Sequence, residues 1–381
     1  MAETLAKTAP SRTPRHVVHV TEAPLGGVVT YLEELLSAQI AGMPDTQIEL
    51  LTPEVNREAL AGLEGPNFKM IAFPHRRGSK ADLMRLGWRV IRHLRRTRPE
   101  ILHIHSSFAG AAIRALAPLI PRGTKVIYCP HGWAFSRRGS KRMQEGVARV
   151  ERALSRVTDR IICISDYERQ EALHAGIAPE KLSVIDNGVS QRSGIPAPEP
   201  KAEDAPRLIA FAGRFDEQKG YDTFLEVMRL LGDEARAIAI GSAIVSADEL
   251  PELPDNVQLL GWQPRDKVYA LYAEADLLLV PSRWEGFGLV AVEAMQARLA
   301  VFASRVGGLQ DIVVDGETGR LFTPDDADQI TAMIRETSDA QLRDYGEAGY
   351  RRYLSRYTAA RMAREVGALY AALLDEGAGR S

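Results

Sequence analysis

Two glutamates, Glu285 and Glu293, stand at a spacing that suits recognition of an extended polar ligand. They open and close the segment EGFGLVAVE, which follows an apolar run at residues 275–280. The run reads as a buried strand, so Glu285 falls in a loop and Glu293 about five residues inside the helix that follows. A rise of 1.5 Å per residue then staggers their backbones by roughly 7 Å along the helix axis. That stagger does not indicate a catalytic carboxylate pair. It suits a ligand with hydroxyls at both ends and negative charge between them, such as a sugar nucleotide.

Two cations could meet that negative charge. Arg214 and Lys219 flank a turn in the segment GRFDEQKG, and a departing diphosphate must be stabilised either by fixed cations or by a metal. Cations in a loop are more often simply solvated. The Gly26-Gly27 pair after the first strand would let backbone approach a phosphate, although a glycine pair is more often plain turn chemistry. His131, between a strand end and a glycine turn, could reach a ligand, although a lone histidine there is more often structural.

Three segments together resemble a known family. EGFGLVAVE is similar to the Glu-x7-Glu motif of retaining glycosyltransferases of family 4 with the GT-B fold. FAGRFDEQKG (211–220) resembles the first strand-to-helix turn of that family's C-terminal domain, and VGGLQDIVVDGETGRLF (306–322) resembles its segment after the motif helix. Their order and spacing agree with the family.

The resemblance implies a role for each candidate residue. It places Arg214 and Lys219 on the donor diphosphate, Glu285 on the donor-sugar hydroxyls and Glu293 on the nucleotide ribose. His131 would lie against the donor sugar. The backbone N–H groups of the helix start would bind sugar and phosphate, although the Phe287 side chain could equally be core. The expected catalytic residues are His131, Arg214, Lys219 and Glu285, and the expected donor-binding residues are Gly26, Gly27, Arg214, Lys219, Glu285, Phe287, Gly288, Leu289 and Glu293.

No metal or other cofactor is expected. Asp326-Ala327-Asp328 matches an Asp-x-Asp metal motif only as a string, and its position predicts a helix N-cap. No His/Cys cluster has the sequence spacing of metal ligands. The substrate implied is a nucleoside-diphosphate sugar, UDP- or GDP-linked, used by a metal-independent enzyme of the hexosyltransferase type. The mechanism usually drawn for the family has the leaving phosphate assist deprotonation of the acceptor, and no enzymic nucleophile is apparent.

The elements that must position these residues alternate between strand and helix. Such alternation predicts mainly parallel sheets with helices on both faces, and 381 residues allow two domains. With the resemblance, this gives an α/β GT-B fold: two Rossmann-like doubly wound domains facing a cleft, with a C-terminal helix that crosses back to the N-terminal domain. The predicted parts are a disordered lead-in (1–14), an acceptor-side domain (15–190), a linker (191–206), a nucleotide-sugar domain (207–355) and the returning helix (356–381).

Charge is divided unequally along the chain. Up to Gly194 there are 28 Lys and Arg against 19 Asp and Glu, and after it 20 against 31. The stretch from Arg76 to Arg98 holds nine of the basic residues and one acid. On a helix its apolar residues gather on one arc and four arginines gather on the opposite, basic face. The apolar arc is Leu83, Leu86, Val90, Ile91 and Leu94, and the basic face is Arg85, Arg89, Arg92 and Arg96. This predicts docking on an anionic membrane surface, although a solvated face is the ordinary alternative. We expect no signal peptide or membrane span, a cytoplasmic protein that associates peripherally with the plasma membrane, and no nucleic-acid partner.

The predicted function is transfer of a sugar to an acceptor hydroxyl with retention at the anomeric carbon. The basic stretch favours a glycan or polyprenyl-diphosphate-linked acceptor, as in bacterial exopolysaccharide or lipopolysaccharide assembly. Two alternatives stay open: a GT-B sugar-nucleotide epimerase, and a catalytically silent subunit that only binds the sugar nucleotide. The lack of a G-x-G-x-x-G fingerprint after the first strand argues against a dinucleotide-dependent dehydrogenase.

Overall fold

The computed structural model describes the chain in six stretches, residues 12–24, 26–76, 78–136, 139–195, 205–242 and 252–378. The chain divides into two compact units. The first is built from Met1–Gly188 together with Ala359–Ser381, and the second from Val189–Thr358. The second unit is therefore inserted between two parts of the first.

The first unit has a seven-stranded sheet in the order β3-β2-β1-β4-β5-β6-β7. All of its strand pairs are parallel. Because neighbouring strands run the same way, their carboxyl ends meet at one edge, where ligands bind in open α/β sheets. The strands are β1 (His16–Thr21), β2 (Gln47–Pro53), β3 (Phe68–Phe73), β4 (Ile101–His105), β5 (Lys125–Cys129), β6 (Arg160–Cys163) and β7 (Leu182–Val184).

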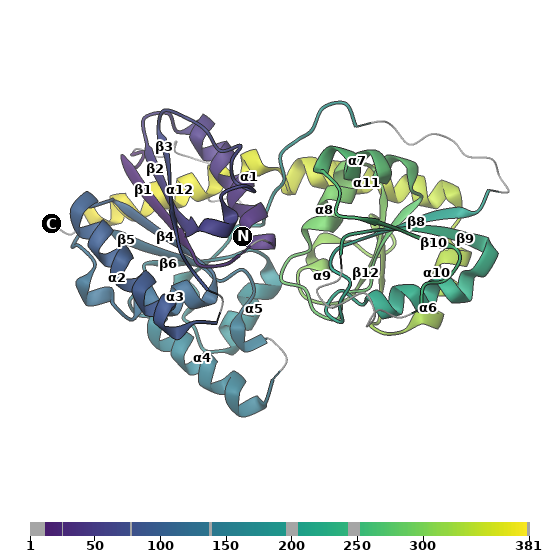
Figure 1. The fold of residues 1–381 in the computed structure, drawn as a ribbon, viewed down its shortest axis with the longest axis horizontal. Coiled ribbons are helices and arrows are strands. Elements are labelled where there is room, and N and C mark those ends of the chain that lie inside the picture. The colour runs from purple at the N-terminus through teal and green to yellow at the C-terminus, as the bar shows by residue number, and fades with distance from the viewer. Residues whose placement is uncertain are drawn as a thin grey trace. The chain divides into compact units, whose positions relative to one another are not determined.

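Helices lie over both faces of this sheet (Figure 1). Strand alternation sends Val18, Val20, Leu102 and Ile104 into a core with the second and third helices. The opposite face carries histidines and is covered by the first helix and the last one, which pack together. The helices of the unit are α1 (Gly27–Gly42), α2 (Lys80–Thr97), α3 (Ser107–Arg114), α4 (Lys141–Ser155), α5 (Asp166–His174) and α12 (Ala359–Ala378).

The second unit has a six-stranded parallel sheet in the order β10-β9-β8-β11-β12-β13. Strand order reverses between β8 and β11, so the loops after these two strands flank the switch point of the sheet. Its strands are β8 (Arg207–Ala212), β9 (Ala235–Ile240), β10 (Val257–Gly261), β11 (Leu277–Val280), β12 (Ala300–Ser304) and β13 (Gly319–Phe322). Its helices are α6 (Tyr221–Leu231), α7 (Arg265–Glu274), α8 (Leu289–Gln296), α9 (Leu309–Ile312), α10 (Ala327–Glu336) and α11 (Asp339–Arg356).

The predicted fold class is confirmed: there are two parallel α/β units, and the last helix packs within the first one. The strands predicted from the sequence are all present to within two residues, whereas β13 was not predicted. The predicted ranges are 15–20, 48–51, 69–72, 101–105, 125–128, 160–164, 182–185, 208–212, 237–240, 257–260, 277–280 and 301–303. Residues 1–11 of the predicted lead-in and 196–204 of the predicted linker lie outside the described residues. Asp326 caps α10, as its sequence position indicates, by accepting from the backbone N–H of Gln329 at 2.9 Å.

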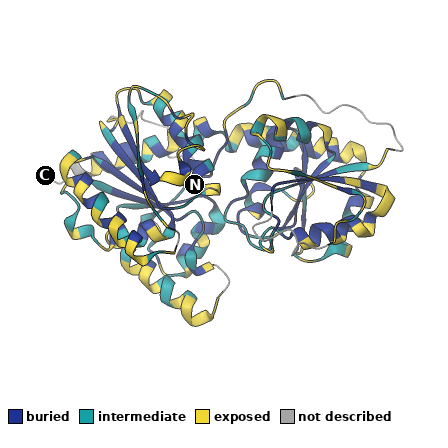
Figure 2. Cartoon of the chain, viewed as in Figure 1, coloured by how far each residue is buried: buried dark blue, intermediate teal, exposed yellow. Residues whose placement is uncertain are grey.

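Burial follows the layers, with dark strands inside and exposed residues on the outer sides of the helices (Figure 2). Cys129 and Cys163 are free and buried. Among the described residues, no helix combines the length and the apolar content needed to cross a membrane.

Candidate active site

In the second unit, the loops after β8 and β11 bring together most of the residues singled out in the sequence. The side chains of Lys219 and Glu285 form an ion pair, and both are largely buried, at 18% and 12% exposure. The backbone N–H of Lys219 donates to Asp216 at 2.9 Å, which fixes the turn that carries the lysine. A cation and a carboxylate are thus held side by side at the switch point of the sheet.

Arg214 lies in the same loop and is more open. Its side chain is 38% exposed; its Nε lies 3.1 Å from Asp216, and an Nη donates to Gln218 at 2.5 Å. These contacts orient the guanidinium without enclosing it. Arg214 can therefore still bind an anion in two-pronged geometry, which suits phosphate.

Glycines allow these loops to pass very close to one another. A Cβ on Gly220, whose φ is +64°, would stand 1.9 Å from the carbonyl oxygen of Pro281. A Cβ on Gly307, whose φ is +50°, would stand 1.7 Å from the carbonyl oxygen of Glu285. The loops after β8 and β12 therefore press directly on the backbone around Glu285, and a larger residue at either glycine must displace it.

The start of α8 lies immediately after Glu285. Gly288 is the N-cap, with a φ of +105°, and Leu289 is the first helical residue. The first N–H groups of a helix have no partner within it and favour an anion. The Phe287 side chain is buried, at 3% exposure, with its ring 5.9 Å from that of Tyr357, so only its backbone is available to a ligand. Glu293 follows within α8 and is half-buried.

In the first unit, the structure brings His131 close to the helix that starts with the glycine pair. Gly26 and Gly27 are exposed at the start of α1, and nothing lies within 4 Å of the position of a Cβ on either. Tyr31, one turn further along α1, meets His131 edge-on with ring centroids 4.5 Å apart. His131 and the glycine turn thus lie at the same edge of the first sheet.

Glu168, buried at the start of α5, holds the loop of His131. Its carboxyl accepts from the backbone N–H of Gly132 at 2.6 Å and of Ile164 at 2.7 Å, which joins the loops after β5 and β6. Burial raises the pKa of Glu168 to about 7, although both hydrogen bonds lower it. His131 itself has a φ of +54°, an unusual conformation for a non-glycine residue. A buried acid thereby helps to keep His131 in a costly backbone geometry.

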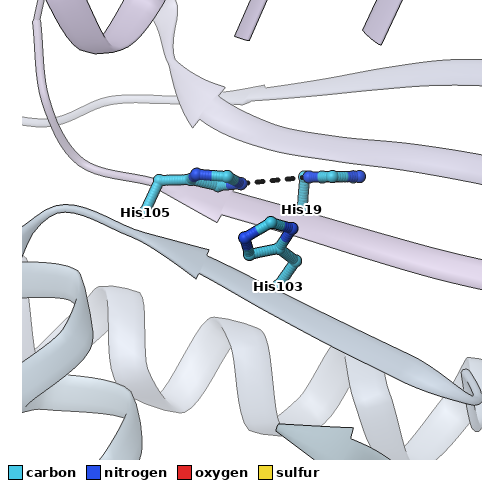
Figure 3. Close-up of side chains that lie close together, drawn as sticks. All are labelled: His19, His103 and His105. Carbon is cyan, nitrogen blue, oxygen red and sulfur yellow. Dashed lines mark hydrogen bonds between the residues drawn. The ribbon is translucent and has the colours of Figure 1, made fainter. Parts of the chain in front are cut away.

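Three histidines, His19, His103 and His105, cluster on the face of the sheet covered by α1 and α12 (Figure 3). His19 and His103 are directly paired on β1 and β4, and all three are fully buried. Burial lowers the pKa of His19 to about 3 and lowers the pKa of His103 and His105 well below the usual value. Neutral imidazoles can bind a transition metal. Within the described residues, two groups have the spacing for one: His19 with His103 and His105, and His105 with Cys129 and His131.

Sequence reasoning missed His19 and Glu168. The only sequence signal for Glu168 is its place three residues after Ser165, the pattern of a local helix cap, and Ser165 does accept from the backbone N–H of Glu168 at 3.1 Å. The sequence around Glu168 does not indicate that its side chain reaches Gly132. His19 becomes notable only once β1 is placed beside β4.

Two family profiles match successive parts of the chain. The one described as Glycosyltransferase Family 4 matches residues 25–192, and the one described as Glycosyl transferases group 1 matches residues 196–353. An uncharacterized 41.2 kDa protein in the cps region of Klebsiella pneumoniae is 32% identical, over 84% of this chain and 89% of its own length. A lipopolysaccharide core biosynthesis mannosyltransferase, LpcC of Rhizobium leguminosarum bv. viciae, is 32% identical over 44% of this chain and 52% of its own length.

Solved structures share the fold over nearly the whole chain. Sucrose-phosphate synthase from Thermosynechococcus elongatus has a TM-score of 0.79 at 21% identity, covering 95% of this chain and all of that one. HepE of Anabaena, solved in complex with UDP and glucose, has a TM-score of 0.73 at 17% identity, covering 96% and 99%. The fold and the family profiles define a glycosyltransferase of the GT-B class. Within that class, the chain belongs to glycosyltransferase family 4, the glycosyl transferases group 1.

Proposed function

We propose that this glycosyltransferase moves a sugar from a UDP- or GDP-linked donor to an acceptor hydroxyl, with retention at the anomeric carbon and without a metal. The observation that carries the proposal is the Lys219–Glu285 ion pair beside the start of α8. The resting ion pair holds both side chains in position. An arriving sugar diphosphate can take each of them, with the phosphate on the lysine and the sugar hydroxyls on the carboxylate.

Stabilisation of the leaving diphosphate is the main task of these groups. Arg214 and Lys219 supply fixed positive charge, and the start of α8 supplies N–H groups and a favourable dipole. Glu293, further along α8, is assigned to the nucleotide ribose. In the first unit, His131 is assigned to the donor sugar and the Gly26-Gly27 turn to the phosphates. Retention follows if the leaving phosphate assists deprotonation of the acceptor on the same face.

The acceptor that we propose is a lipid-linked glycan, and the exposed surface of helix α2 supports this proposal. Leu86, Val90, Ile91 and Leu94 are buried, as the predicted apolar arc requires. The outer face exposes Met84 at 66% and Trp88 at 54%, among exposed arginines. Arg89, expected on the basic face, is instead half-buried with its guanidinium 5.3 Å from the centre of the Phe73 ring. The exposed arginines of the helix are Arg85, Arg92, Arg95 and Arg96.

This face of α2 offers both the electrostatic attraction and the apolar contact that hold proteins on anionic membranes. Each basic residue near an acidic surface contributes about 1 kcal/mol. Trp88 and Met84 add an apolar contact at the lipid boundary, where tryptophan is favoured. One relative is named for lipopolysaccharide core biosynthesis and another for a cps region, and both names support such an acceptor.

A hollow beside the start of α2 offers a place for an acceptor phosphate. Its volume is about 390 Å³, and it opens after the carboxyl end of β3. Asp82 contacts Arg76 and Arg85 there and holds their side chains in place. The lining residues are Phe73, Pro74, His75, Arg76, Asp82, Arg85, Leu86 and Arg89.

Product analysis tests the transferase against its two alternatives. The protein is incubated with UDP- and GDP-hexoses, alone and with a polyprenyl-diphosphate-linked sugar, and products are read by mass spectrometry and anomeric NMR. Acceptor-dependent transfer with the donor's anomeric configuration is expected. A changed sugar or free nucleoside diphosphate formed equally well without acceptor would indicate an epimerase. Binding without turnover would indicate a silent subunit.

A further inference from the structure

Helix α4 exposes a stripe of apolar side chains on its outer side. Met143, Val150 and Val157 are exposed at 51%, 52% and 43%. Each lies seven residues from the next, and residues at that spacing stay within about 20° of one another around a helix. A different side of α4 faces the core, where Val147 and Ala148 pack. The outer stripe is therefore apolar surface that the packing of the first unit leaves in solvent.

A stripe of arginines runs beside the apolar one. Arg142, Arg149 and Arg156 each precede a residue of the apolar stripe by one position, and all three are exposed. Arg156 caps the helix with a φ of −66° and a ψ of −30°, so the helical spacing continues to the end of both stripes. Arg149 contacts Glu145 at 3.5 Å, but both side chains are more than half exposed, and such surface ion pairs are weak. The arginines can therefore turn to another anion.

Helix α4 belongs to the same layer as α2 and α3. The buried residues of α2 and α3 and the inner side of α4 pack against one core, and α3 contacts both neighbours (Figure 1). Phe108, near the start of α3, is 59% exposed. Together the three helices contain eleven Lys and Arg and three Asp and Glu. Their outer sides, which Figure 2 shows as largely exposed, thus form one basic surface with apolar residues within it.

The opposite face of the first sheet has the reverse charge. The helices that cover it, α1 and α12, together contain two Lys and Arg against five Asp and Glu. Among the described residues, no large exposed apolar side chain lies on either of these helices. A negatively charged surface will therefore attract the layer of α2, α3 and α4 and repel the layer of α1 and α12.

The mixture of charge and apolar surface fits a lipid bilayer better than a nucleic acid. Nucleic acids are bound chiefly through their phosphates, by basic and polar groups, and do not require a stripe of aliphatic residues beside them. An anionic bilayer offers acidic head groups to arginine and an apolar boundary to Met, Val and Phe. The same pairing recurs on α2, where Met84 and Trp88 are exposed among arginines.

We propose that α4 is a second membrane-docking element, and that the first unit lies on an anionic bilayer with the layer of α2, α3 and α4 toward the lipid. The stripe of Met143, Val150 and Val157 enters the head-group boundary, and the arginine stripe binds the acidic head groups. Helix α12 then faces the water. The inference rests on the proposed function only in that α2 is already assigned to the membrane.

Sedimentation with vesicles of phosphatidylcholine and phosphatidylglycerol tests the arginine stripe. Each basic residue near an acidic surface strengthens binding about fivefold, so replacement of all three arginines by glutamine should weaken binding about 100-fold. The control makes the same change of charge at three exposed arginines of the second unit, Arg236, Arg343 and Arg351, and should bind as the wild type does. An unchanged affinity of the α4 variant would overturn the proposal.

A fluorescent label tests which face meets the lipid. Cys129 and Cys163 are buried, so a label can be directed to a cysteine introduced at an exposed site. On anionic vesicles, a label on Val150→Cys should shift to shorter wavelength and be quenched by brominated lipid, whereas a label on Ala368→Cys, exposed on α12, should do neither. Equal signals from the two sites would refute the orientation. Tight binding of double-stranded DNA, with no shift at position 150 on vesicles, would make the surface a nucleic-acid site instead.

Transfer to an acceptor dissolved in detergent separates this inference from the proposed function. The α4 variant should keep the wild-type kcat there, because its arginines take no part in the candidate active site. If the wild type binds vesicles as described but transfers no sugar in detergent, the proposed function fails and the docking stands. If the wild type transfers sugar but the α4 variant binds vesicles as tightly as the wild type, the docking by α4 fails alone.

Discussion

Replacement of Glu168 by glutamine should change how the stability of the first unit depends on pH. The pKa of Glu168 is raised by burial from 4.5 to about 7. The native state therefore holds this proton more tightly than the unfolded chain does, and the free energy of unfolding falls as pH rises from about 4.5 to about 7. Each pKa unit corresponds to 1.36 kcal/mol, so the loss amounts to about 3 kcal/mol.

Glutamine cannot ionise, so Glu168→Gln removes this slope. The glutamine amide has only one acceptor oxygen, so its N–H₂ group must face the backbone N–H of either Gly132 or Ile164, and that hydrogen bond is lost. At low pH this loss should lower the free energy of unfolding by about 1–3 kcal/mol. The gap in stability between wild type and variant should then close as pH rises. Native-state hydrogen exchange of the β5 and β6 amides reads the opening free energy of the first unit alone.

The control is Glu180→Gln, an exposed position of the same unit. It should keep the wild-type pH dependence. Parallel stability curves for wild type and Glu168→Gln across this range would show that Glu168 is ionised throughout, and the account of a buried protonated acid would be wrong.

The remaining predictions concern the second unit and the surface. Lys219→Ala and Glu285→Ala should each lower turnover by about 10²- to 10³-fold while unfolding curves stay near the wild type; near-normal turnover of the Lys219 variant would remove that residue from the diphosphate. Activity should survive exhaustive chelation, and its loss with recovery on adding Mg²⁺ or Mn²⁺ would contradict stabilisation by fixed cations. Gly307→Ala should abolish donor binding in a titration, because the added Cβ would displace the backbone of Glu285. The control Gly146→Ala lies in α4 with open space around it, so it should leave the free energy of unfolding unchanged or raise it by about 0.5–1 kcal/mol. Binding to anionic vesicles, measured by sedimentation, should weaken with added salt and when the four exposed arginines of α2 are replaced by glutamine. As a control, the same replacement of four exposed arginines of the second unit, Arg229, Arg236, Arg343 and Arg351, should leave binding unchanged. Equal binding to neutral vesicles would reject membrane docking by charge.

Much of the fold was predictable because strands buried on both faces read as short apolar runs between turn signals. The apolar run at residues 275–280 is one example, and strand β11, Leu277–Val280, lies within it. β13 was missed because Gly319–Phe322 is only four residues long, begins with glycine and follows a turn. Its place in the sheet depends on pairing with β12, which the local sequence does not encode.

The candidate site residues of the second unit were predictable because each lies in a short loop that follows a recognisable strand. Arg214 and Lys219 belong to one turn, and Glu285 follows a recognisable strand. The ion pair between Lys219 and Glu285 joins residues far apart in the chain, so no local pattern contained it. The same holds for the contact between His19 and His105, since these two residues meet only through the pairing of β1 with β4.

The return of α12 to the first unit has a consequence for synthesis on the ribosome. The hydroxyl that bonds His103 belongs to Tyr370, 267 residues later in the chain. At about 5–20 residues per second, the partner arrives on the order of ten seconds or more after the strand has emerged. The inserted unit can fold before then, while the histidine face of the first sheet is covered by α1 but still lacks α12. A nonsense mutation shortly before Ala359 should therefore leave a well-folded second unit attached to a first unit that chaperones and proteases recognise as unfinished.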